Sequence, residues 1–185
     1  MAARLRSVGA AVAFAAGTLL VAACAPAGGP TVPSPGGGLP TQGPTRSAGP
    51  VVAQTRAELV RVLGTKNLVL QDSQAPFRPP EDAQFTTAPR ALYQVLLPQA
   101  PQEGFIVVYE FPDPSRALEA ATGQAAYLAS GPAKVQSAFG ARHIIRLVGP
   151  TVVLYSWVPE GAEDPLQPDI QAALETLGTG VPVPS

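Results

Sequence analysis

Few residues of this chain have the types and spacing that enzyme chemistry needs. His143 is the single histidine and Cys24 the single cysteine. A metal site needs several converging His, Cys or carboxylate ligands, and a hydrolytic triad needs a nucleophile beside a histidine and a carboxylate. His143 alternates with Ile145 and Leu147, which predicts that it packs at a core edge on a strand. No Gly-x-Ser-x-Gly motif occurs, so neither a metal site nor a triad is predicted.

Two pairs of adjacent carboxylates could exchange protons in general acid–base catalysis. They are Glu81-Asp82 and Glu163-Asp164, and both stand in segments bounded by prolines. Such segments form loops, so we interpret both pairs as solvated loop charges. The sequence also lacks a Walker A loop and a dinucleotide glycine fingerprint. We therefore expect no metal, no cofactor and no catalytic residue.

Two sets of residues could bind a partner or a ligand. Arg142 and Arg146 fall on one face of a predicted strand, about 13–14 Å apart, and could grip an acidic partner. A solvated strand face would explain them equally. Tyr109, Tyr155 and Trp157 share the parity of their positions on two predicted strands and could line a ligand pocket. The same parity fits a core face, on which Trp157 would be buried.

The first 23 residues have the pattern of a secretory signal. Residues 1–6 include two arginines, and residues 8–23 run for sixteen positions without a charge. A basic start followed by an apolar run is typical of a signal peptide. The run is short for a permanent membrane span, which needs roughly 20 apolar residues.

The end of this run resembles the lipobox of bacterial lipoproteins. It reads Val21-Ala22-Ala23-Cys24, an aliphatic residue and two small residues before a cysteine, although Leu is commoner than Val at the first position. The resemblance covers residues 1–24 only. It implies cleavage between Ala23 and Cys24, a diacylglycerol on the Cys24 thiol, and an acyl chain such as palmitate on the new amino terminus. The alternatives are an ordinary secretory signal with a chance cysteine, or an uncleaved anchor.

This resemblance implies a location at the cell membrane, facing outside the cytoplasm, with the membrane itself as a partner through the lipid on Cys24. Because Cys24 is the only cysteine, no intramolecular disulfide can form. Without residues 1–23 the chain keeps ten basic and thirteen acidic residues, a net charge of −3. That balance argues against nucleic acid as a partner.

Residues 24–50 predict a lipidated cysteine followed by a disordered linker. Residues 25–50 contain seven prolines, seven glycines and one charged residue, Arg46. Such a segment has too little apolar surface to offset the entropy of ordering. As a flexible coil it would hold a folded domain roughly 25–30 Å from the lipid.

Residues 51–178 have the composition of one globular domain, and residues 179–185 resemble a flexible tail. Apolar periodicity predicts two to three helices and four to five strands. Helices are expected over 53–63, 114–130 and 168–177, and strands over 67–71, 90–97, 104–111, 142–148 and 151–158. Asp113-Pro114 is a helix start, and Gly149-Pro150 joins a hairpin.

These elements predict a single α+β domain, a mostly antiparallel sheet with helices packed on one face. Residues 106–111 and 152–157 align at an offset of 46 residues, and each precedes a predicted helix. The domain could therefore consist of two strand–strand–helix units, by duplication or by chance.

Together these features predict a membrane-tethered extracytoplasmic lipoprotein with a small non-enzymatic domain. That domain would bind an envelope protein, an envelope polymer or a small ligand, or assist envelope assembly. One alternative is an extracytoplasmic enzyme whose site the sequence does not reveal. Another is a small ligand-capturing component that serves a transporter, although a two-lobed solute-binding protein would need a longer chain.

Overall fold

The computed structural model describes residues 49–159 and 164–184. The predicted signal peptide, Cys24 and nearly all of the linker lie outside the described residues. The described chain forms one six-stranded antiparallel sheet, in the order β1-β2-β3-β5-β4-β6, and five helices. This confirms a single α+β domain.

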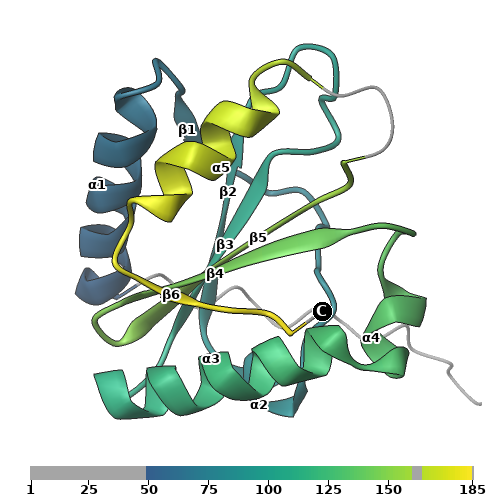
Figure 1. Cartoon of the computed structure of the whole chain (residues 1–185). Helices are drawn as coiled ribbons and strands as arrows, with labels where there is room; N and C mark the ends of the chain where they lie inside the picture. The colour runs from purple at the N-terminus through teal and green to yellow at the C-terminus, as the bar shows by residue number, and fades with distance from the viewer. Residues whose placement is uncertain (1–48, 160–163, 185) are drawn as a thin grey trace, which may run out of the picture. The chain divides into compact units, whose positions relative to one another are not determined.

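Figure 1 shows how these elements are arranged. The strands are β1 (Leu70–Asp72), β2 (Arg90–Val95), β3 (Phe105–Glu110), β4 (Arg142–Val148), β5 (Thr151–Trp157) and β6 (Thr179–Val181). The helices are α1 (Pro50–Gly64), α2 (Ala83–Thr87), α3 (Pro114–Ala129), α4 (Gly131–Gln136) and α5 (Gln167–Glu175). In the described ranges no helix is both long enough and apolar enough to cross a bilayer.

Two local sequence signals act as expected. Asp113 caps α3, because its Oδ1 accepts hydrogen bonds of 2.9 Å from the backbone N–H groups of Ser115 and Arg116. Pro114 occupies the first helical position, where no N–H is needed. Gly149, with φ of 56°, turns the chain between β4 and β5. The predicted hairpin is therefore confirmed.

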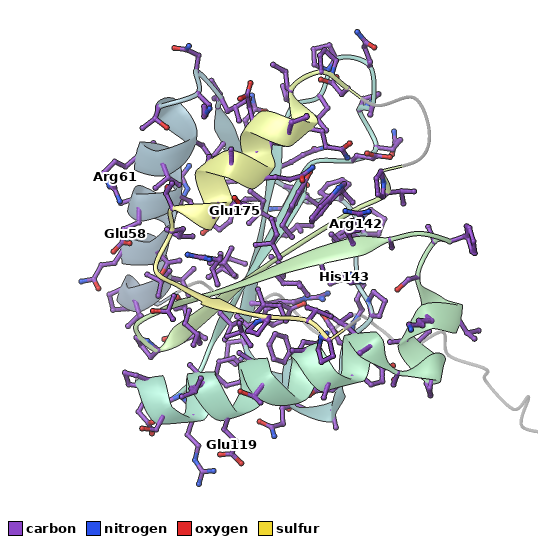
Figure 2. All side chains as sticks on the ribbon, viewed as in Figure 1. Glu58, Arg61, Glu119, Arg142, His143 and Glu175 are labelled. Atoms are coloured by element: carbon purple, nitrogen blue, oxygen red, sulfur yellow. The ribbon has the colours of Figure 1, made fainter. Side chains whose placement is uncertain are left out.

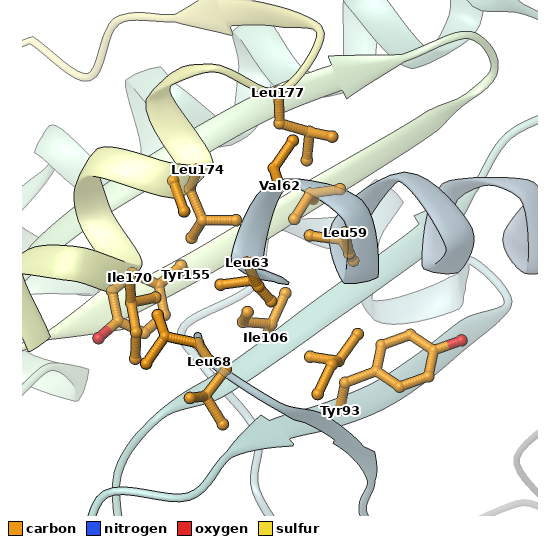
Figure 3. Close-up of a cluster of buried hydrophobic side chains, with 14 of the residues drawn as sticks. Leu59, Val62, Leu63, Leu68, Tyr93, Ile106, Tyr155, Ile170, Leu174 and Leu177 are labelled. Atoms are coloured by element: carbon orange, nitrogen blue, oxygen red, sulfur yellow. The ribbon is translucent and has the colours of Figure 1, made fainter. Parts of the chain in front are cut away.

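Helices cover both faces of the sheet rather than the single face expected from the sequence (Figure 1). On one face α1 and α5 pack on Ile106, Val108 and Tyr155 (Figure 3). On the other face α2 and α3 pack on Val107 and Tyr109. The reason is that β3 and β5 are apolar at consecutive positions, and such strands need cover on both sides.

The buried stripes of two helices differ from the expected ones. On α1 the helical spacing of Ala57, Val60 and Leu63 predicts one buried stripe, but Ala57 and Val60 are exposed and only Leu63 is buried. On α3 Leu118 is 51% exposed. Small side chains form the buried stripe of α3, which lets this helix approach the sheet closely, and they are Ala117, Ala120, Ala121 and Ala125.

The order strand–strand–helix does occur twice, as β2-β3-α3 and β4-β5-α5. However, β3 and β5 are antiparallel neighbours, β2 and β4 lie on their outer sides, and α3 and α5 lie on opposite faces. Compared with the first unit, the second has its inner strand running in the opposite direction, its outer strand on the opposite side of that strand, and its helix on the opposite face of the sheet. That operation is an inversion, which no rotation can produce. The two units are therefore not copies of one structure.

The predicted flexible tail begins with a strand. β6 pairs with β4, with Thr179 opposite Leu147 and Val181 opposite Ile145. Gly178 allows the chain to enter this pairing. Its φ of 43° suits glycine, and a Cβ at this position would collide with the carbonyl oxygen of Leu147. A segment of three residues is too short for its apolar pattern to predict a strand.

Candidate ligand-binding pocket

The three aromatic residues singled out from the sequence do not share a face. Tyr155 pairs with Ile106 across β3 and β5, so residues of opposite parity point the same way. Tyr109 consequently points toward α2 and α3, and Tyr155 toward α1 and α5. Both are fully buried core residues. Trp157 lies beside Tyr155, with ring centroids 5.4 Å apart, but is only half-buried.

The two arginines on β4 also have separate roles. The guanidinium of Arg146 donates hydrogen bonds to the carbonyl oxygens of Leu177 and Gly178, just beyond α5. Arg146 therefore holds the end of that helix in place. Arg142 is exposed at the start of β4 (Figure 2). The sequence hypothesis of one cationic grip for an acidic partner is not supported by this arrangement.

His143 pairs with Ser156 across the β4–β5 hairpin. The His143 Nδ1 and Ser156 Oγ atoms lie 2.8 Å apart, so these side chains share a hydrogen bond. His143 lies on the same face as Ile145, as expected, and is half-buried. Burial lowers the pKa of the imidazole, which therefore favours the neutral form near pH 7.

A pocket of about 210 Å³ opens where β3 and β4 begin and β5 ends, and we call it the aromatic pocket. Its wall is mostly apolar, and His143 and Ser156 form one polar edge. Phe77 and Phe105 stack against each other with centroids 4.6 Å apart. The lining includes the aromatic residues Phe77, Phe105 and Trp157, the polar pair His143 and Ser156, and the charged residues Arg78 and Glu103.

A wider hollow, the side groove, lies next to the aromatic pocket and shares His143 and Trp157 with it. Its volume is about 800 Å³. Arg142, Phe139 and Glu175 also line it. Residues 137–141 therefore form a wall between two concave regions.

A buried carboxylate fixes the loop that carries Phe77. The side chain of Glu81 is only 2% exposed. Its oxygens accept hydrogen bonds from Arg78 at 2.6 Å, from Arg90 at 2.7 Å and from the hydroxyl of Tyr109 at 2.6 Å. Burial and this carboxylate together hold the pKa of Tyr109 well above its usual range. The interpretation of Glu81 as a solvated loop charge was wrong, because two guanidiniums compensate its burial.

Asp82 and Gln124 fasten the same loop to the helices. Asp82 Oδ1 caps α2 by accepting hydrogen bonds from two backbone N–H groups. The Asp82 backbone N–H donates to Gln124 Oε1 at 2.8 Å, and Gln124 Nε2 donates to the Pro80 carbonyl at 2.7 Å. Gln124 is fully buried on α3 with both ends of its amide satisfied.

The interpretation of the second carboxylate pair as solvated loop charges was wrong for Asp164. Asp164 is 1% exposed and accepts hydrogen bonds from the backbone N–H groups of Gln99 and Leu166. It ties the β2–β3 connection to the start of α5. Glu163 lies outside the described residues. Over 49–159 and 164–184, no group of three or more His, Cys, Asp or Glu residues could hold a metal ion.

Sequence reasoning missed Ser156, Phe77 and Phe105 as pocket residues. Ser156 could have been found, because a two-residue hairpin turn at Gly149-Pro150 places it opposite His143. The pairing of Phe77 with Phe105 depends on the path of a proline-rich loop, which no periodic pattern reveals.

Comparison of the chain with protein-family models, curated proteins and solved structures finds no match.

The first prediction concerns the buried carboxylate. Glu81→Gln keeps the side-chain shape but leaves Arg78 and Arg90 without their anion, so urea unfolding should show a loss of about 2–4 kcal/mol. The matched control is Glu119→Gln, which removes an exposed pair with Arg116 and should cost about 0–1 kcal/mol. Equal effects of the two substitutions would contradict the role of Glu81.

The second prediction concerns the single histidine. In a proton NMR titration, the pKa of the His143 ring should be lower in the folded protein than in urea, where it should be about 6.5. The unfolded chain therefore binds the proton first as the pH falls. The free energy of unfolding should decrease from pH 7 toward pH 5.5, and by less in His143→Gln. A folded-state midpoint at or above the value in urea would exclude the burial effect.

Proposed function

We propose that this protein is a lipid-anchored, extracytoplasmic, non-enzymatic binding module. A lipid on Cys24 holds it at the cell membrane, and its domain binds a small, largely apolar ligand in the aromatic pocket. The observation that carries the binding role is the pocket itself. Its mostly apolar lining combines three aromatic side chains with the His143–Ser156 pair and with the charged residues Arg78 and Glu103. Ligand sites commonly combine an apolar lining with a few placed polar groups.

The size of the pocket limits the ligand. A volume of about 210 Å³ is smaller than the roughly 300–1,000 Å³ of drug-sized sites. It suits one ring or a short branched chain. Phe77 and Trp157 offer apolar contact, and the Nε2 atom of His143 offers a hydrogen bond, because Nδ1 already contacts Ser156. A small cyclic molecule with one polar group fits this chemistry.

The surroundings of His143 favour binding over acyl transfer. A serine nucleophile needs a histidine base that a carboxylate orients. Glu81 is engaged by Arg78 and Arg90, and Asp164 by backbone N–H groups. Glu103, the carboxylate in the pocket lining, accepts a hydrogen bond from Gln167 Nε2 at 3.0 Å. These three acids are therefore engaged by other partners, and the His143–Ser156 pair stands as a polar edge of the pocket.

Support for the anchor comes from the sequence. The Val21-Ala22-Ala23-Cys24 run follows a basic start and an uncharged segment in the register of a lipobox. The described domain starts 25 residues after Cys24, at residue 49, which leaves a tether between lipid and domain. Capture of a ligand at the envelope, for a partner protein or a transporter, is the role that this organisation suits.

The third prediction tests the anchor. Mass spectrometry of the amino-terminal peptide from the producing bacterium should find Cys24 carrying fatty acyl chains, with the protein in the membrane fraction. Cys24→Ser should abolish the lipid and release or misprocess the protein, whereas Val21→Leu, the commoner lipobox residue, should leave lipidation intact. An unmodified, soluble wild-type protein would refute the anchor.

The fourth prediction tests the pocket, using the fragment of residues 49–185 and phenol as the probe. Phenol should shift the indole N–H resonance of Trp157 saturably. Phe77→Ser should weaken phenol binding about tenfold, because aromatic stacking is worth about 1 kcal/mol beyond area burial. Val69→Ser, which changes a side chain that is 65% exposed elsewhere, is the control. Linear shifts, or equal affinity in both variants, would argue against the site.

A further inference from the structure

The two most exposed large apolar side chains of the described residues lie four positions apart in the sequence. Phe139 is 93% exposed and Val135 is 87% exposed. Both belong to residues 131–142, which comprise α4, its connection to β4 and the first residue of β4, and which we call the docking segment. Single exposed apolar residues are ordinary, whereas two that are almost fully exposed within five residues of one segment point to an interaction surface.

The charge of the docking segment is positive. Lys134 precedes Val135, Arg142 follows Phe139 by three residues, and both are exposed. No acidic residue occurs between 131 and 142. Glu175 is the acidic residue that faces this segment across the side groove. Apolar side chains bordered by cations match the chemistry of an anionic phospholipid surface.

The length of the tether allows this segment to reach the membrane. Figure 1 shows α4 well away from α1, where the tether ends. The 25 residues from 25 to 49 span at most about 80–90 Å when extended, whereas a domain of this size measures roughly 35–40 Å across. Any face of the domain can therefore meet the bilayer. Tethering also raises the effective concentration, so a weak contact suffices.

We infer that the docking segment binds an anionic lipid surface, with Phe139 and Val135 in the interfacial layer and Lys134 and Arg142 at the headgroups. This inference rests on the proposed lipid anchor. The docking segment also supplies Ser137 and Ala138 to the wall of the aromatic pocket. Docking consequently places the pocket beside the bilayer, where an apolar ligand partitions.

The fifth prediction places a reporter on the segment. The acylated full chain is reconstituted into vesicles of phosphatidylcholine, with or without an equal part of phosphatidylglycerol, whose acyl chains are brominated. Phe139→Trp combined with Trp157→Phe gives a single tryptophan at the tip. Its fluorescence should shift to the blue and lose most of its intensity in vesicles containing phosphatidylglycerol. Adding Lys134→Glu and Arg142→Glu should restore the intensity.

The matched control is Leu118→Trp with Trp157→Phe, because Leu118 is an exposed apolar residue on the outer side of α3. This reporter should remain unquenched. If the chain floats with the vesicles but both reporters respond equally, the docking inference fails and the anchor stands. If the chain does not float, both fail. A blue shift without quenching that grows with protein concentration would identify a second copy of the chain as the occupant, which also overturns the inference.

Discussion

The buried Glu81 carboxylate determines the shape of the candidate site. One half of the sheet face opposite α1 and α5 is covered by α3, and the other half by α2 and a proline-rich loop. That loop contains no helix or strand that would hold it in place by regular packing. Glu81 joins it to Arg90 on β2 and Tyr109 on β3, so loop and sheet share one satisfied polar network. Phe77 can then stack on Phe105 and close a wall of the aromatic pocket.

Burial of the central strands on both faces is the second constraint. β3 and β5 have apolar side chains at successive positions, so each face of the sheet needs its own hydrophobic layer. Distribution of α1 and α5 to one face and α3 to the other meets that need. The strand ends that remain uncovered, at the start of β4 and the end of β5, are where the aromatic pocket and the side groove open.

The sequence predicted the parts of the fold that depend on local chemistry. The cap at Asp113, the turn at Gly149-Pro150 and the α+β class follow from a few neighbouring residues. The side of the sheet on which each helix packs, and the opposite orientations of Tyr109 and Tyr155, depend on strand register, which joins residues far apart in sequence. The role of Glu81 was missed for the same reason, because its partners come from three separate segments.

The burial of His143 has a consequence for the proposed role of the domain at a membrane. An anionic membrane surface with a potential of about −30 mV concentrates protons roughly threefold, which lowers the local pH by about half a unit. A histidine with an ordinary pKa would become more protonated there. Burial lowers the pKa of His143, which opposes this effect and favours the neutral ring. A neutral His143–Ser156 edge matches the uncharged, largely apolar ligand that we propose for the pocket.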